Sequence, residues 1–246
     1  MPVGHYPSSG SRRFQMDTHA RLRESSRAMA PSRVIHNTEG VAWLKEQRFA
    51  DSHAVITSMP DVSEMNLSFE AWREWFSDTS QLICERVAPR GVALFFQTDV
   101  KRDGRWVDKA YLVQRGAERA GSFQLFHKVV CRAPPGMTTF GRPAWAHLLA
   151  FSRELTVEPG EATADVLPQL GEMPWARAMG VEACEVAVKF VKGKPKASVV
   201  VDPFCGLGTV LAVANRHGLD AVGVELSRKR AEKAQTLEVR PPKGTP

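Results

Sequence analysis

The residues whose types and spacing are best suited to chemistry form a glycine-rich run late in the chain. Residues 198–209 read Ser-Val-Val-Val-Asp-Pro-Phe-Cys-Gly-Leu-Gly-Thr, which predicts a buried strand, a tight turn and the start of a helix. Gly206 and Gly208 let the backbone approach a ligand closely, because glycine has no Cβ atom. Asp202, at the end of the strand, can accept hydrogen bonds from the turn or from a cationic ligand group. The run is typical of a nucleotide-binding loop.

A second carboxylate follows at the distance expected for a ribose-binding acid. Residues 221–225, Ala-Val-Gly-Val-Glu, predict a strand that ends in Glu225, 17 residues after Gly208, close to the spacing in nucleotide-binding folds. A glycine helix cap and an ordinary surface glutamate would explain the two features separately. Strand, turn, helix, strand and acid nevertheless come in the order that one binding site requires, so we interpret them together.

A parallel sheet flanked by helices is the element arrangement that would position these groups. From residue 33 onward, short apolar runs alternate with amphipathic stretches of helix length. The expected strands are 33–36, 54–58, 92–98, 123–130, 147–152, 198–202 and 221–225; the expected helices are 40–47, 69–87, 108–119, 174–192, 209–217 and 228–236. Strands 123–130 and 147–152 have no helix between them, so they should pair antiparallel at an edge of the sheet. The pattern predicts an α/β fold with a Rossmann-like, seven-stranded, doubly wound sheet and an antiparallel edge hairpin.

The two motifs together resemble those of a known enzyme family. DPFCGLGT and AVGVEL are similar to motifs I and II of the amino-methyltransferases, usually close to DPFxGxGT and xIGIEx. The resemblance implies a class I methyltransferase fold with S-adenosylmethionine as cofactor. Asp202, Phe204, Gly206 and Gly208 would surround its methionine part, and Glu225 would hold its ribose hydroxyls. The adjoining motif positions, also implied as cofactor-binding, are Cys205, Thr209 and Leu226.

The rest of the chain matches the circularly permuted, β-type order of that family, in which the catalytic half precedes the cofactor half. Residues 36–45 resemble the GDAxxxL segment, which implies that Glu39 lies near the adenine of the cofactor. Residues 126–128 resemble a WHK stretch and residues 147–151 an HExxLxF strand. The resemblance covers about residues 33–236.

The catalytic motif departs from the family pattern. In the family, the fourth strand ends in (D/N/S)PP(Y/F/W), which accepts hydrogens of the target amino group and stacks an aromatic ring on a flipped base. Here the strand ends in Ser58, Met59, Pro60 and Asp61. Serine occurs in the family at the first position and Pro60 is retained, but methionine replaces a proline and aspartate replaces the aromatic residue.

Three interpretations of this departure remain open. Methyl transfer relies mainly on positioning, so the altered motif could still hold an exocyclic amine. Asp61 could instead act as a general base for a ring imino nitrogen such as uracil N3, whose proton must leave. A degenerate subunit that binds cofactor or nucleic acid without catalysis is the third. For Asp61 alone, a helix N-cap or turn role is as common as a catalytic one.

Composition and charge limit the class of protein. Lys and Arg number 33 against 27 acidic residues, a net charge of +6, which suits a polyanionic partner. No apolar run approaches the roughly 20 residues that span a bilayer, so no membrane insertion is expected. The four cysteines show no metal-ligand spacing, which predicts no metal and a reducing, intracellular setting; nucleus, cytoplasm and organelle all stay open.

The expected partner is a nucleic acid, with RNA favoured over DNA. The segment 133–143 is short where family DNA enzymes carry a sizeable recognition region, which suits recognition of RNA by shape or a site presented by a protein partner; a homodimer is also compatible. Basic residues after strand ends or on the edge hairpin could contact phosphates, or could be solvated loop charges: Lys101, Arg102, Arg105, Lys128, Arg132 and Arg142.

The chain divides into a methyltransferase domain and two tails. Residues 1–32, Arg- and Ser-rich, are expected to form a disordered basic tail that is also similar to an organelle transit peptide; residues 33–238 form the domain, and 239–246 a second tail. Two other classes compete. A Rossmann oxidoreductase is disfavoured because the loop lacks the third glycine of GxGxxG, and a binding-only nucleic-acid module is the non-enzyme alternative.

Overall fold

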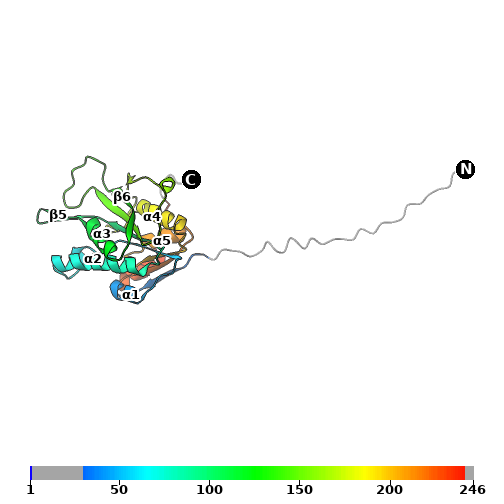
Figure 1. The fold of residues 1–246 in the computed structure, drawn as a ribbon, viewed down its shortest axis with the longest axis horizontal. Helices are drawn as coiled ribbons and strands as arrows, with labels where there is room; N and C mark the ends of the chain where they lie inside the picture. The colour runs from blue at the N-terminus through cyan, green and yellow to red at the C-terminus, as the bar shows by residue number, and fades with distance from the viewer. Residues whose placement is uncertain (2–29, 242–246) are drawn as a thin grey trace. The chain divides into compact units, whose positions relative to one another are not determined.

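A computed structural model describes Met1 and residues 30–241, and within this part the chain forms a sheet with helices on both faces (Figure 1). The predicted tails lie largely outside the described residues. None of the described helices is long and apolar enough to cross a membrane.

The sheet has eight strands, one more than predicted. Its order is β1 (Arg33–His36), β10 (Asp220–Val224), β9 (Val199–Asp202), β2 (His53–Thr57), β3 (Ala93–Gln97), β7 (Trp145–Ser152), β6 (Phe123–Cys131) and β8 (Val166–Leu167). The first five strands run parallel, and β7 is antiparallel to both β3 and β6, which confirms the predicted hairpin. The additional strand β8 pairs with β6 at the edge.

Among residues 30–241, three helices cover each face of the sheet. One face carries α1 (Gly40–Glu46), α2 (Phe69–Arg86) and α3 (Lys109–Arg119); the other carries α4 (Val181–Gly193), α5 (Thr209–Arg216) and α6 (Arg228–Thr236). Two short 3-10 turns are η2 (Val62–Glu64) and η3 (Pro159–Glu161). The predicted helix at 174–192 begins only at Val181. The segment before it packs against residues 170–172 instead, since the Val181 N–H donates to the Glu172 carbonyl oxygen and a Cβ at Gly180 would lie 2.0 Å from the Leu170 carbonyl oxygen.

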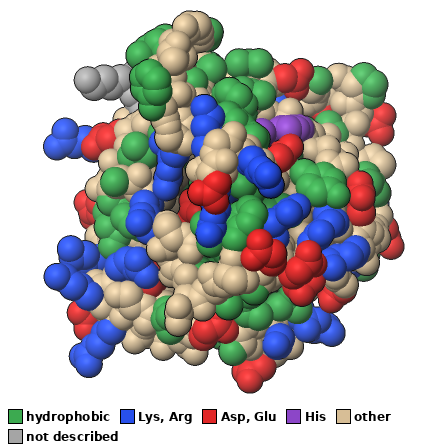
Figure 2. All heavy atoms as spheres, turned by 90° about the vertical axis from the view of Figure 1, so that its left-hand side faces the viewer, with side chains coloured by type: hydrophobic (Ala, Val, Ile, Leu, Met, Phe, Trp, Pro, Cys, Tyr) green, Lys and Arg blue, Asp and Glu red, His purple; other side chains and the backbone are tan. Residues whose placement is uncertain are grey.

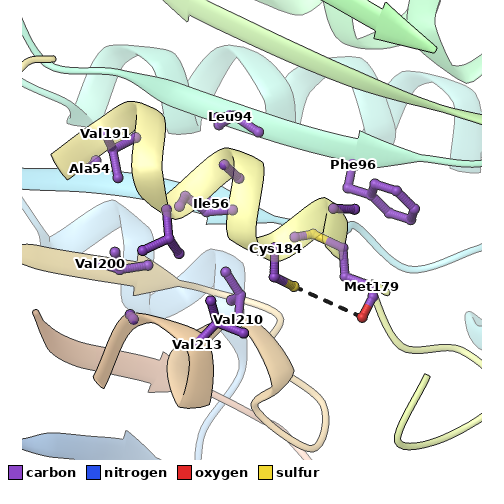
Figure 3. Close-up of a cluster of buried hydrophobic side chains, with 14 of the residues drawn as sticks. Ala54, Ile56, Leu94, Phe96, Met179, Cys184, Val191, Val200, Val210 and Val213 are labelled. Carbon is purple, nitrogen blue, oxygen red and sulfur yellow. Dashed lines mark hydrogen bonds between the residues drawn. The ribbon is translucent and has the colours of Figure 1, made fainter. Parts of the chain in front are cut away.

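The strands divide their side chains between two cores because alternate residues face opposite sides of a sheet. In β2, Ala54 and Ile56 face the α4 side while Val55 faces the α2 side. Figure 3 shows the first core, in which Cys184 and Val191 of α4 lie against strand residues Ile56, Leu94, Phe96 and Val200 and against Val210 and Val213 of α5. On the other face, Gly116 lets α3 approach α2, since a Cβ there would lie 2.3 Å from the Ser77 carbonyl oxygen.

A small two-stranded hairpin, β4 (Val100–Arg102) and β5 (Arg105–Val107), follows β3 and was not predicted. Its turn is formed by Asp103 and Gly104, with φ of 50° and 73°, the positive values that a tight hairpin turn requires. It projects from the edge where the parallel strands end. Parallel strands all end at one edge, so the segments after β1, β2, β3, β9 and β10 meet there.

Candidate active site

A cavity of about 540 Å³ lies at this edge, where the segments after β2, β9 and β10 come together. Of the nine residues predicted to bind a cofactor, eight line it: Glu39, Asp202, Phe204, Cys205, Gly206, Thr209, Glu225 and Leu226. Gly208 does not. Ser58, Met59 and Pro60 of the altered catalytic motif line the same cavity. The structure therefore brings both predicted sites together.

Asp202 is a buried carboxyl with one oxygen available to a ligand. Its Oδ1 accepts hydrogen bonds from Thr57 Oγ1 at 2.7 Å and from the Phe204 N–H at 3.1 Å, while Oδ2 accepts none from the described residues. Burial raises the pKa of Asp202 to about 7, against the opposing effect of these two bonds. A buried acid in this state gains most from a cationic ligand group, which would restore its ionised form.

The glycine loop leaves a second polar group without a partner. Thr209 is the first residue of α5, and its Oγ1 is buried without a hydrogen-bond partner among the described residues. Gly206 and Gly208 precede it with φ of 56° and 79°, in the left-handed region that favours glycine. A Cβ at Gly208 would lie 3.1 Å from Ala234 of α6. Gly208 therefore shapes the turn and its packing, whereas Thr209 lines the cavity with its hydroxyl oxygen buried and unpartnered among the described residues.

Glu225 is held in place through one oxygen, which leaves the other for a ligand. Its Oε1 accepts the Ser227 N–H at 2.7 Å and Arg230 Nε at 2.9 Å. Its Oε2 accepts no hydrogen bond from the described part of the chain. Leu226 follows at the rim, 69% exposed. The free oxygen can therefore accept a hydrogen bond from a hydroxyl group of a bound ligand.

Glu39 lines the cavity but has a structural duty as well. It is the N-cap of α1, and its two carboxylate oxygens accept the N–H groups of Val41 at 3.0 Å and Ala42 at 2.6 Å. Each oxygen can accept one further bond. The resemblance alone gave no sign of this capping role.

The apolar wall of the cavity was not predicted. It is formed by Trp75 of α2 and by side chains from two irregular segments: Met65, Leu67, Trp175 and Met179. Trp175 lies against the glycine loop, since a Cβ at Gly206 would come within 2.9 Å of its ring. No motif singled out these residues: Met65 and Leu67 lie in a segment without strand or helix periodicity, and Trp175 and Met179 were expected inside the predicted helix 174–192.

Asp61 lies beside this cavity, in a smaller one of about 50 Å³ that also has Ser58 and Met59 in its wall. Asp61 is 8% exposed. Its Oδ2 accepts a hydrogen bond from Lys109 Nζ at 3.2 Å, and Arg142 lies 3.9 Å from the same oxygen. Asp61 is also the N-cap of η2, and its N–H donates to Glu64 Oε2. It is thus both a turn residue and one half of a buried ion pair.

Lys109 is a residue that sequence reasoning missed. It is the first residue of α3 and only 4% exposed. Burial lowers the pKa of Lys109, while the neighbouring Asp61 carboxylate raises it and so opposes the shift. In the sequence, the only distinguishing feature of Lys109 is that it directly follows the helix cap Asp108. That feature does not predict contact with Asp61, which lies 48 residues earlier in the chain.

A hydrogen-bonded chain supports Lys109 from the sheet side. Asp99 Oδ1 accepts the Lys109 N–H at 2.8 Å, and Oδ2 accepts Trp106 Nε1 at 2.9 Å and His147 Nε2 at 3.1 Å. His147 Nδ1 lies 2.8 Å from His127 Nε2. Burial alone would raise the pKa of Asp99, but the hydrogen bonds from these donors outweigh it and hold that pKa below its usual value.

The same region contains the one group of described residues with metal-ligand spacing: Asp99, Asp108 and His147. Asp99 already accepts three N–H groups, and Asp108 accepts the Tyr111 N–H as the cap of α3. These carboxylates are therefore engaged by N–H donors, and the arrangement fits a hydrogen-bond network better than a metal centre.

The predicted nucleic-acid contacts fall into two groups, with one correction. Lys101, Arg102 and Arg105 lie on the β4–β5 hairpin, and Arg132 and Arg142 line the small cavity beside Asp61. Figure 2 shows lysine and arginine side chains spread over the face that carries this hairpin.

Lys128 is the correction to that prediction. It is 3% exposed, and its ammonium donates to the carbonyl oxygens of Thr163 and Ala164. Two of its three protons are used by these carbonyls and Asp165 lies 3.8 Å away, so the buried ammonium is not accessible to a phosphate. Its role is to hold the segment that leads into β8.

Three solved structures share this fold over most of the chain. TTHA0409 from Thermus thermophilus, a candidate DNA modification methylase complexed with S-adenosyl-L-methionine, is 21% identical with a TM-score of 0.63 and covers 82% of this chain and 91% of its own. The cytosine-N4-specific PvuII DNA methyltransferase is 13% identical with a TM-score of 0.67, covering 83% and 86%. The complex of M1.HpyAVI with S-adenosylmethionine is 15% identical with a TM-score of 0.57, covering 82% and 98%.

At these identities the likeness concerns the fold, and it defines the fold class. No family model matches the chain, and no curated protein matches it in sequence. The chain has the class I methyltransferase fold, with the glycine-loop strand β9 late in the sequence and central in the sheet. The predicted fold class is therefore confirmed.

Proposed function

We propose that this protein is an S-adenosylmethionine-dependent methyltransferase that modifies a nucleobase nitrogen in a nucleic acid, with RNA favoured over DNA. The observation that carries the proposal is the single cavity shared by the glycine loop, Glu225 and the end of β2. A methyl donor bound against the loop would present its methyl group toward the residues after β2. The neighbours bound to S-adenosylmethionine and the DNA specificity of the PvuII enzyme support the same class of reaction.

The polar groups of the cavity fit the polar parts of that cofactor. Asp202 would attract a cationic group of the methionine part, and the unpartnered Thr209 hydroxyl lies at the same loop. Glu225 Oε2 would accept the ribose hydroxyls. Glu39 and the apolar wall would enclose the adenine, with one lone pair on each Glu39 oxygen left for its amino group. A cavity of about 540 Å³ lies within the usual range of ligand sites.

The bound cofactor supplies an electrophilic methyl group, and the protein must hold a nucleophile in line with it. Ser58 and Pro60 lie in the wall of the donor cavity, so a base placed against the end of β2 would come within reach of the methyl group. Such an in-line displacement gains most from orientation and from exclusion of water. The mostly apolar lining, which includes Trp75 and Trp175, would serve the second need.

Two features favour RNA as the carrier of the target base. The segment 133–143 between β6 and β7 is too short to read a long duplex sequence. The β4–β5 hairpin carries Lys101, Arg102 and Arg105 beside the exposed Trp106, a combination of cations and an aromatic ring that suits phosphates and unstacked bases.

The test is methyl transfer by the purified full-length protein. RNA and DNA from cells that lack the protein are incubated with S-adenosylmethionine carrying an isotopically labelled methyl group, digested to nucleosides and analysed by mass spectrometry. We expect label on a base nitrogen in the RNA fraction. Label only in DNA would refute the RNA preference, and no label in either fraction would refute the proposed reaction. Parallel calorimetric titrations with S-adenosylmethionine and NADH test the oxidoreductase alternative. That alternative predicts that the protein binds NADH and does not bind S-adenosylmethionine.

A further inference from the structure

We propose that the Asp61–Lys109 pair is the site that receives the target nitrogen, and that this nitrogen is a ring N–H next to a carbonyl group, as in uracil N3 or guanine N1. The inference rests on the proposed function and names its substrate class. It distinguishes this chain from an enzyme that methylates an exocyclic amine, because the pair offers one proton acceptor and one cation side by side.

The location of the pair is the first argument. The small cavity that contains Asp61 and Lys109 shares part of its wall with the large cavity proposed for the methyl donor; the shared residues are Ser58, Met59, Glu64, Arg177 and Ala178. Asp61 follows Pro60, which lines the donor cavity, by one residue. A base whose ring edge faced Asp61 would therefore lie next to the transferable methyl group.

The burial of the pair is the second argument. Lys109 and Asp61 are 4% and 8% exposed, and their side chains meet at 3.2 Å. Lys109 Nζ lies over the rings of Trp72 and Phe76, at 5.7 and 5.9 Å from their centres. A buried ion pair is on balance a weak source of stability, because both charges lose their hydration. Its presence at the end of β2 is better explained by chemistry than by folding.

The support behind Lys109 is the third argument. Its backbone N–H is fixed by Asp99, which His147 and Trp106 hold in turn. The backbone from which the Lys109 side chain extends is therefore fixed by Asp99, and through Asp99 by Trp106 of β5 and His147 of β7. The other charged side chains that line the small cavity are Arg142, 3.9 Å from Asp61, then Arg132, and Glu64 with its ion-pair partner Arg177 at 2.6 Å.

The chemistry of an imino nitrogen uses both members of the pair. The N–H proton passes to the Asp61 carboxylate, and the nitrogen electron pair forms the new bond to the methyl carbon. The carbon–sulfur bond breaks, and its electron pair stays on sulfur, which becomes neutral. Negative charge that develops on the adjacent carbonyl oxygen is stabilised by the Lys109 ammonium. Asp61 then releases its proton to water, so charge and atoms balance.

An exocyclic amine would be served poorly by the same pair. The ring nitrogen next to such an amine would accept a hydrogen bond from Lys109, and a cation there withdraws electron density from the amine that must attack. The amine also needs no base before attack, because its protons can leave afterwards. The pair therefore favours a nitrogen that becomes nucleophilic by losing a proton.

The experiment determines the product and tests both members of the pair. Full-length protein is given RNA and DNA with labelled S-adenosylmethionine, and the methylated nucleoside is identified for the wild type, Asp61→Asn, Lys109→Met and Lys109→Arg. We expect a ring-N-methylated uridine or guanosine. Asp61→Asn and Lys109→Met should lose about 10²- to 10⁴-fold in turnover with unchanged affinity for S-adenosylmethionine, and Lys109→Arg should retain more activity than Lys109→Met.

A pH series separates catalysis from a structural role. Raising the pH should partly restore turnover in Asp61→Asn, because the imino nitrogen then loses its proton without the carboxylate, whereas a merely misfolded variant would not recover. Arg119→Gln is the matched control: it removes a cation and an exposed ion pair with Asp78 from the far end of α3, and its turnover should match the wild type.

Two results would overturn the inference while leaving the proposed function intact. One is a wild-type product that is methylated on an exocyclic amine. This result is obtained with the wild type alone, so it does not depend on whether any variant folds. The other is near-normal turnover in both Asp61→Asn and Lys109→Met. If the wild type labels no nucleic acid at all, the proposed function fails, and the inference fails with it.

Discussion

Lowering the pH below 7 is expected to weaken binding of S-adenosylmethionine, because Asp202 must be ionised to attract a cationic group. Burial raises the pKa of Asp202 from 3.8 to about 7, and the bonds from Thr57 and Phe204 only partly oppose this. Near neutral pH the carboxyl is thus poised between its two forms. A cationic ligand group binds only the ionised carboxylate. When Asp202 is protonated, it must therefore lose its proton before the ligand can bind.

The size of the effect follows from this linkage. Below its pKa, each pH unit should weaken binding about tenfold, which amounts to roughly 20-fold between about pH 7.5 and about pH 5.5. The stability of the fold changes in the opposite direction: it falls as the pH rises, whereas cofactor binding strengthens. The pKa of Asp202 is higher in the folded than in the unfolded chain, so its ionised form destabilises the fold by about 4 kcal/mol. That penalty is absent below about pH 4, grows as the pH rises and is complete above about pH 7.

The assay compares the wild type with Asp202→Asn, which keeps an acceptor oxygen for Thr57 Oγ1 and the Phe204 N–H. Calorimetric titration with S-adenosylmethionine across the pH series should give a sloping profile for the wild type and a weak, flat one for the variant. The α-amino group of the ligand titrates equally in both, so the difference between the profiles isolates Asp202. Thermal unfolding above pH 7 should show the variant to be the more stable protein.

Either of two outcomes would refute this reasoning. Wild-type affinity that stays constant over the whole range would mean that the carboxyl does not titrate where its burial implies. Asp202→Asn that binds as tightly as the wild type would mean that the charge does not contact the ligand, and the raised pKa would then be a consequence of packing alone.

Two further predictions concern the ribose end of the cavity and the basic hairpin. Glu225→Ala should weaken S-adenosylmethionine binding by about 1.5–3 kcal/mol, roughly ten- to a hundredfold, by loss of hydrogen bonds to a charged acceptor; calorimetry that gives equal affinities would contradict the assignment. Alanine at Lys101, Arg102 and Arg105 together should reduce the slope of log affinity for single-stranded RNA against log salt by up to about 2, measured by fluorescence anisotropy. Lys128→Met is the control, expected to lower the melting temperature and leave the slope unchanged, and an unchanged slope in the triple variant would exclude the hairpin as a phosphate contact.

Local patterns made the half of the fold that carries the glycine loop predictable. In the β9–α5–β10 unit, a short apolar run, two glycines and a terminal carboxylate follow one another within 28 residues. Each step depends on neighbours in the chain, since glycine permits the positive φ at 206 and 208 and short continuous apolar runs mark the buried strands. Helix α6 was predicted with its observed bounds for the same reason.

Elements that depend on distant partners were missed or misjudged. The β4–β5 hairpin has short, charged strands without alternation, although Asp103-Gly104 is a turn signal that could have indicated it. Strand β8 has two residues and exists only through its pairing with β6. Lys128 belongs to an exposed type of residue, and its burial depends on carbonyl groups 35 and 36 residues away.

The sequence by itself indicated a parallel α/β sheet and the glycine loop after β9, because these follow from short-range periodicity and from the residue types that a tight turn requires, whereas the permuted order was implied by the resemblance to the amino-methyltransferases. It identified Asp61 as a departure from a resembling motif but left its role open between a turn, a base and a packing position. Only the tertiary structure placed Lys109 beside Asp61 and put the pair next to the donor cavity. Charges brought together from separate elements acquire a common role through burial and proximity, which no local pattern encodes.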